Sequence, residues 1–140
     1  MTAKSFADTN IAIYAEGSDE SKAQRATAIL ESGPVISSQV VTETINALTR
    51  KYGFTLAEAH EIALSLLDLC EVVPVGAGTI REAIRLAARY QLSHWDSLIV
   101  AAAMLAGCET LYSEDLQHNQ LFDERLKVVN PFTELALKEK

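Results

Sequence analysis

Four carboxylate side chains lie far apart in the sequence, at positions from which a single site could form. Asp8 and Asp115 each follow a short apolar segment that is predicted to be a strand. Asp96 stands in the first turn of one expected helix, and Glu43 stands near the second turn of another. The carboxyl ends of parallel strands share one edge of a sheet, where open α/β folds place their ligands. The sequence therefore predicts one acidic site at this edge.

Carboxylates gathered in one cleft repel one another unless a cation lies between them. Two unit charges about 4 Å apart repel by about 4 kcal/mol at an effective dielectric constant of about 20. Such a group either raises the pKa values of its members or binds a metal ion. Oxygen ligands without a nearby histidine or thiolate favour Mg²⁺ or Mn²⁺ over zinc. An ion of this kind can polarise a phosphate oxygen and generate a hydroxide for in-line attack.

Each of these carboxylates also has a purely structural explanation. Asp8 could form only an Asx turn, and Asp96 could serve only as a helix-capping carboxylate. Glu43 could be an ordinary surface glutamate, and Asp115 could cap the turn that follows it. Glu114 competes with Asp115 for the same role. We prefer Asp115 because its side chain is shorter and stiffer.

Apolar segments bounded by turn residues alternate with helical patterns along the chain. Strands are expected at Ser5–Asp8, Val35–Ile36, Cys70–Val75, Thr110–Ser113 and Lys127–Val129. Helices are expected over residues 11–15, 20–32, 38–52, 55–69, 79–90 and 93–106, with capping boxes at Thr55-x-x-Glu58 and Thr79-x-x-Glu82. This alternation predicts an α/β domain with a parallel sheet covered by helices on both faces.

The composition is that of one globular domain. The chain has 140 residues, of which 49% are hydrophobic and 22% are charged. The net charge of −7 argues against a broad basic face for duplex DNA, but allows a nuclease with local basic residues or a basic partner. The longest apolar run, Leu98–Ala106, is too short to span a membrane, and the N-terminus lacks a signal-peptide pattern. Cys70 and Cys108 have apolar neighbours, so we expect reduced core cysteines in a cytoplasmic protein.

Three arginines, Arg81, Arg85 and Arg89, recur at helical spacing and would lie on one helix face. The simpler interpretation is a solvated face. The alternative is a track that contacts the phosphates of RNA.

Several segments together resemble a known family. They are Asp8-Thr9-Asn10, Glu43, the segment from His94 to Ile99, and Ser113-Glu114-Asp115-Leu116-Gln117. In their order and spacing they resemble the PIN domain, and within that family the VapC-type toxins of bacterial type II toxin–antitoxin pairs. The resemblance covers nearly the whole chain.

This resemblance implies a three-layer α/β/α domain over residues 1–132, with a parallel sheet of strand order 3-2-1-4-5. The composition of residues 133–140 predicts a polar tail after it. It implies an endoribonuclease dependent on Mg²⁺ or Mn²⁺ that cleaves tRNA or other structured RNA. It further implies a homodimer that a cognate antitoxin inhibits by lying over the acidic cleft. Asp8, Glu43, Asp96 and Asp115 would then be metal ligands, and Asn10 and Ser113 would support them by hydrogen bonds.

Two other function classes stay open. The domain could bind RNA or a protein without turnover, as a non-catalytic PIN-like module. It could also be a phosphatase with Asp8 as the nucleophile. The phosphatase is disfavoured because position 10 is Asn10, where phosphatases of the haloacid dehalogenase type have a second aspartate.

Overall fold

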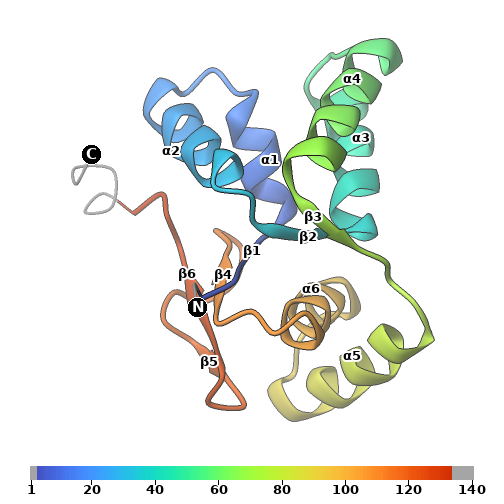
Figure 1. Ribbon diagram of the computed structural model, residues 1–140, viewed down its shortest axis with the longest axis vertical. Coiled ribbons are helices and arrows are strands. Elements are labelled where there is room, and N and C mark those ends of the chain that lie inside the picture. Colours follow the sequence, from blue (N-terminus) through green and yellow to red (C-terminus); the bar gives the residue numbers. More distant parts are fainter. Residues whose placement is uncertain (1–2, 134–140) are drawn as a thin grey trace.

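The structure is a computed structural model that describes residues 3–133. These residues form one mixed sheet with helices on both faces, which confirms the predicted α/β class (Figure 1). The predicted tail, residues 133–140, lies almost wholly outside the described residues. No helix within the described part of the chain is long and apolar enough to cross a membrane.

The sheet has six strands in the order β3-β2-β1-β4-β6-β5. The strands are β1 Ser5–Ala7, β2 Val35–Ser37, β3 Glu71–Val73, β4 Thr110–Tyr112, β5 Leu121–Phe122 and β6 Leu126–Val129. All neighbouring strands are parallel except β5, which pairs antiparallel with β6. Leaving out β5, the order is the expected 3-2-1-4-5. The structure adds a short antiparallel edge strand that the sequence analysis missed.

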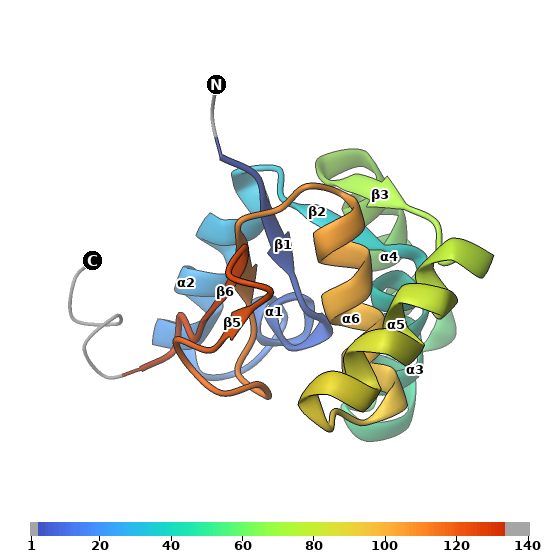
Figure 2. The ribbon, with the colours of Figure 1, turned by 90° about the horizontal axis from the view of Figure 1, so that it is seen from below.

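The helices are α1 Thr9–Ala15, α2 Glu20–Glu31, α3 Ser38–Lys51, α4 Leu56–Leu69, α5 Ala77–Tyr90 and α6 His94–Leu105. Helices α1 to α4 cover one face of the sheet, and α5 and α6 cover the other (Figure 1). This division follows from right-handed crossovers, because the chain moves outward from β1 to β3 and then returns across the sheet to β4. Figure 2 shows α6 lying between the sheet and α5.

Side-chain caps start several of these helices where the sequence predicted them. Thr55 and Glu58 form the expected capping box, and the Ser93 hydroxyl accepts a hydrogen bond from the Asp96 amide. Asp8, predicted to end the first strand, is instead the N-cap of α1, so this helix begins two residues before the predicted Ile11. Each cap satisfies an amide that has no partner within its helix.

The predicted start of α5 was wrong. The helix begins at Ala77 after the N-cap Gly76, so Thr79 lies in its first turn rather than at its cap. The Thr79 hydroxyl accepts a hydrogen bond from the Gly76 amide at 3.1 Å, so the Thr79 side chain contacts the backbone of the N-cap residue. Strand β3 is also shorter than predicted, because Cys70 caps α4 and Pro74 has no N–H to continue the ladder.

Helix α6 is the centre of the core. Every residue from Ser97 to Met104 is buried, as the apolar run Leu98–Ala106 predicted, but the prediction fails at Leu105, which is 59% exposed. The helix ends at Leu105, and Gly107, just beyond the C-cap Ala106, has a φ of +78°, a left-handed conformation that glycine adopts without a steric penalty. The rigid placement of α6 fixes the position of Asp96 in its first turn.

Candidate functional site

The acidic site lies at the carboxyl ends of the two central strands. Ala7 of β1 pairs with Tyr112 of β4, and the Asp8 amide donates a hydrogen bond to the Tyr112 carbonyl at 3.0 Å. The strands therefore end level, and the residues that follow them meet. The Ser113 hydroxyl donates to Asp8 Oδ2 at 2.7 Å and accepts from the Asp115 amide at 3.1 Å. One hydroxyl thus links two of the predicted carboxylates.

Asp8 is the most buried of the four carboxylates, with 5% of its surface exposed. Burial raises its pKa to about 6, although hydrogen bonds from Ser113 and Thr9 oppose the shift. The negative charges of Asp115 and Asp96 raise it further, so both of these carboxylates lie near enough to act on Asp8. A buried carboxylate that lacks a cationic partner among the described residues is a favourable position for a metal ion.

Glu43 is held from two sides. The Thr9 hydroxyl donates to Glu43 Oε1 at 2.8 Å, and the Gln39 amide donates to Oε2 at 3.3 Å. The same Gln39 nitrogen donates to the Trp95 carbonyl at 3.3 Å, which joins α3 to the start of α6 beside Asp96. Gln39 is buried, and its Oε1 atom has no partner among the described residues. Sequence reasoning missed Gln39, although its position one turn before Glu43 places it on the same helix face.

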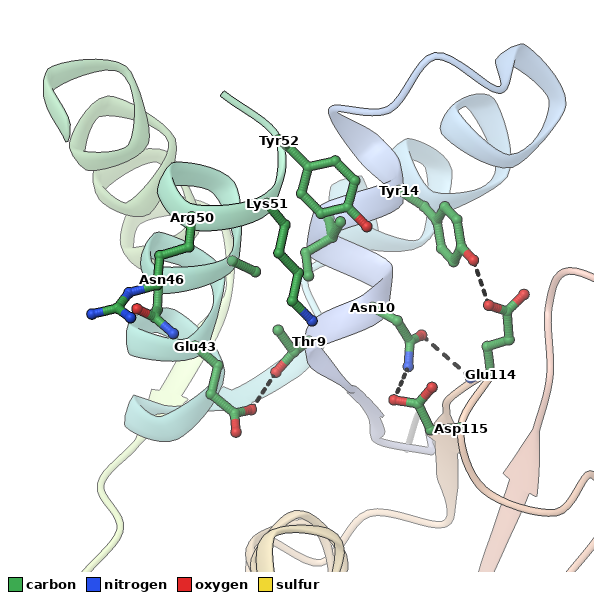
Figure 3. Close-up of a pocket in the computed structure, with 12 residues that line it drawn as sticks. Thr9, Asn10, Tyr14, Glu43, Asn46, Arg50, Lys51, Tyr52, Glu114 and Asp115 are labelled. Atoms are coloured by element: carbon green, nitrogen blue, oxygen red, sulfur yellow. Dashed lines mark hydrogen bonds between the residues drawn. The ribbon is translucent and has the colours of Figure 1, made fainter. Parts of the chain in front are cut away.

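The two acidic residues after β4, Glu114 and Asp115, both line the cleft but have different partners. Asn10 donates from Nδ2 to Asp115 Oδ2 at 3.2 Å and accepts from the Glu114 amide at 3.3 Å. The Glu114 carboxylate lines the same cleft but points toward Tyr14, from whose hydroxyl it accepts a hydrogen bond (Figure 3). It also forms a 3.2 Å ion pair with Lys22. The charge of Glu114 is therefore balanced by Lys22, whereas Asp115 has no ion pair within residues 3–133.

Asp96 is half-buried in the first turn of α6, where its amide donates to the Ser93 hydroxyl at 3.1 Å. Its carboxylate accepts no hydrogen bond from residues 3–133, and its charge acts on Asp8. The capping explanation concerns the backbone of Asp96 only, so its carboxylate is available for another role.

The four carboxylates do not form a ready-made ligand cage. Among the residues that the structure describes, no three histidine, cysteine, aspartate or glutamate side chains lie close enough to hold a metal ion. Like charges without a cation between them stay apart, and ligands must approach a magnesium ion to about 2 Å. Side-chain rotations would therefore be needed to close a site. The donors are all oxygens, a set that fits a hard divalent cation.

A cleft of about 430 Å³ opens beside these residues. Its acidic part is formed by Glu43, Glu114 and Asp115, with Thr9 and Asn10 between Glu43 and Asp115 (Figure 3). Asp8 and Asp96 lie beside this cleft and do not line it. The opposite part is the end of α3, which contributes Asn46, Arg50, Lys51 and Tyr52. Sequence reasoning missed this second set. Helical spacing gave a signal, because Glu43, Asn46 and Arg50 follow one another at i, i+3 and i+7.

The arginines of α5 are placed elsewhere. Arg85 binds Asp123 at 2.5 Å and also pairs with Glu82, and Arg89 lies 3.4 Å from Asp123. Arg81 is exposed, and none of the three lines the cleft. Two of the three thus connect α5 to the turn between β5 and β6. A role for this stripe in RNA binding stays a prediction.

Comparison with protein families gives a match over nearly the whole chain. The PIN domain matches residues 5–136. The chain belongs to the PIN domain family. This confirms the resemblance on which the expected fold was based, and no curated protein matches the sequence itself.

Solved structures share the fold of this PIN domain. A toxin–antitoxin complex from Klebsiella pneumoniae is 22% identical with a TM-score of 0.66, and the match covers 94% of this chain and 98% of that one. VapC20 from Mycobacterium tuberculosis, described as a sarcin–ricin loop cleaving toxin, is 20% identical with a TM-score of 0.62, over 80% of this chain and 90% of that one. DNA-bound VapBC from Salmonella typhimurium is 16% identical with a TM-score of 0.67, over 91% and 97%.

Proposed function

We propose that this PIN domain is a metal-dependent endoribonuclease and the toxin of a type II toxin–antitoxin pair. The observation that carries the proposal is the surroundings of Asp8. This carboxylate is buried at the end of β1, its pKa is raised to about 6 by burial, and two further carboxylates act on it. A divalent cation would relieve this repulsion, and the site opens to a cleft large enough for part of a nucleotide chain.

Asp8, Glu43, Asp96 and Asp115 would hold Mg²⁺ or Mn²⁺. When bound, the ion supplies a polarised phosphate oxygen and a water of lowered pKa. Hydrogen bonds hold three of these ligands near the site, because Ser113 contacts Asp8, Asn10 contacts Asp115, and Thr9 and Gln39 contact Glu43. These contacts limit how far the side chains must rotate to close around an ion, and a site closed in this way needs little further rearrangement when the substrate reacts.

The partners of the proposed toxin follow from the structures that it resembles. Similarity to a sarcin–ricin loop cleaving toxin supports structured RNA as the substrate. Similarity to toxin–antitoxin complexes supports a cognate antitoxin. We also propose that this antitoxin lies over the acidic cleft. We also propose a homodimer in the cytoplasm, and a contribution of Arg81, Arg85 and Arg89 to RNA binding.

The test is cleavage of total cellular RNA or tRNA by the purified chain with added Mg²⁺ or Mn²⁺. We expect Asp8→Asn and Asp96→Asn to lower the cleavage rate about 100-fold or more, because each removes a ligand charge with little change of shape. Asp68→Asn, an exposed aspartate on α4, is the matched control and should leave the rate unchanged. Full activity in excess EDTA, or in either site variant, would rule out this mechanism.

One observation favours a second candidate, a module that binds RNA or protein without turnover. No three potential metal ligands within residues 3–133 are close enough to hold an ion as they stand. A binding module predicts that the chain retains RNA in a filter-binding assay without cleaving it at any metal concentration. Expression in bacteria separates the two, since growth arrest that requires Asp8 indicates the enzyme.

A further inference from the structure

We propose that the C-terminal end of α3, formed by Arg50, Lys51 and Tyr52, binds an unpaired segment of the RNA beside the scissile phosphate. The inference rests on the proposed ribonuclease function and adds the site that receives the strand. It assigns phosphate contacts to the two cations and base stacking to the tyrosine.

The position of these side chains relative to the acidic residues supports this assignment. All three line the same cleft as Glu43 and Asp115. Arg50 follows Glu43 by seven residues on one helix, which is about 10 Å at 1.5 Å per residue. Figure 3 shows the Lys51 amine extended toward Thr9. The cations therefore lie next to the reacting position rather than at it, where a neighbouring phosphate would pass.

Arg50 and Lys51 are the basic residues that line the cleft. Four basic side chains elsewhere are engaged in ion pairs, namely Lys4 with Glu71, Lys22 with Glu114, and Arg85 and Arg89 with Asp123. Arg25, Arg81, Arg125 and Lys127 form no ion pair within residues 3–133, but they do not line the cleft. Arg50 and Lys51 have no side-chain hydrogen bond or ion pair within residues 3–133. A polyanion entering an acidic cleft on a chain of net charge −7 needs local positive charge on the path.

Basic residues at a helix C-terminus also interact favourably with the helix dipole. That explanation accounts for the charge of Arg50 and Lys51, but not for the aromatic residue beside them. Tyr52 is 56% exposed and lines the cleft with them. An exposed ring next to two cations is the combination that stacks an unpaired base and holds its phosphates. Bases inside a duplex are already stacked, so the site favours a single strand.

The experiment measures binding without cleavage. Fluorescein-labelled oligouridylate is titrated with the Asp8→Asn chain, by anisotropy over a range of salt concentrations, and a labelled RNA duplex serves as the second probe. Arg50→Ala with Lys51→Ala should weaken binding of oligouridylate about tenfold and lower the salt slope by about 1.4, or about 0.7 per lost phosphate contact. Tyr52→Ala should weaken it about fivefold or more without changing the slope, and Tyr52→Phe should restore it.

The matched control is Arg125→Ala with Lys127→Ala, which removes the same charge from exposed positions outside the cleft. Equal losses in both double variants would show an effect of net charge alone and overturn the proposal, as would equal affinity for the duplex. Unchanged binding in the Arg50 and Lys51 variant, with normal cleavage by the native chain, would overturn this inference and leave the ribonuclease intact. Failure of the native chain to cleave RNA at all would instead overturn the proposed function.

Discussion

Asp8 is a buried carboxylate whose pKa lies well above its ordinary value, and the effect on stability can be measured without any substrate. Burial raises its pKa from 3.8 to about 6, with the charges of Asp115 and Asp96 adding to the shift. The folded chain therefore binds this proton more tightly than the unfolded chain does. Stability from this group is fully present below about pH 4 and falls as the pH rises to about 6.

Asp8→Asn should abolish that pH dependence. The amide keeps the shape of the side chain and carries no charge, so above pH 6 the variant should be more stable than the native chain by about 2–3 kcal/mol. Near pH 4 the difference should vanish. Urea denaturation in EDTA measures it, with Asp68→Asn expected to follow the native curve. Parallel curves for Asp8→Asn and the native chain would show that Asp8 titrates normally.

At the scale of secondary structure elements, the turn between β5 and β6 carries local strain. Asp123 and Glu124 both have positive φ, at +50° and +57°, which is typical of a type I′ turn that favours asparagine and glycine. Asp123 is fixed by Arg85 and Tyr90, whereas Glu124 is exposed. Glu124→Gly should therefore stabilise the fold by about 1 kcal/mol. Glu124→Ala keeps a Cβ atom and should not, and thermal unfolding of both variants would decide the matter.

The same turn shows why the sequence predicted most elements but not all of them. Apolar periodicity and side-chain caps predicted five strands and all six helices, because those signals lie within single segments. The two-residue strand β5 has no such signal. The turn after it has type I′ geometry, but its residues, Asp123 and Glu124, are not the asparagine and glycine that mark such a turn in a sequence.

The four carboxylates of the candidate site could be brought to one sheet edge by topology alone. The pairing of Glu114 with Tyr14 and Lys22 and the contacts of Gln39 depend on tertiary packing, which spacing does not encode.

For the whole molecule, the carboxylates at the acidic edge of the sheet repel one another and lower the stability of the fold. A bound metal ion would remove this repulsion and stabilise the folded state. Any ligand that binds only the folded state stabilises it by about 2.7 kcal/mol at a free concentration of about 100 times its Kd. For a domain of this size that gain corresponds to a rise in Tm of about 5–10 °C. Because the chain has a net charge of −7, part of any salt effect is general screening, which sodium chloride also supplies.

We therefore expect millimolar Mg²⁺ or Mn²⁺ to raise the Tm of the native chain when ionic strength is held constant with sodium chloride. Asp96→Asn and Asp115→Asn should reduce this rise, because each removes a carboxylate that acts on Asp8 without filling the core. Asp68→Asn should retain the full rise, since its carboxylate is exposed on α4. An equal rise in Tm in all variants would show that the ions bind to the charged surface in general and not to the acidic site. No rise in the native chain would mean that the four carboxylates do not form a metal site at these concentrations.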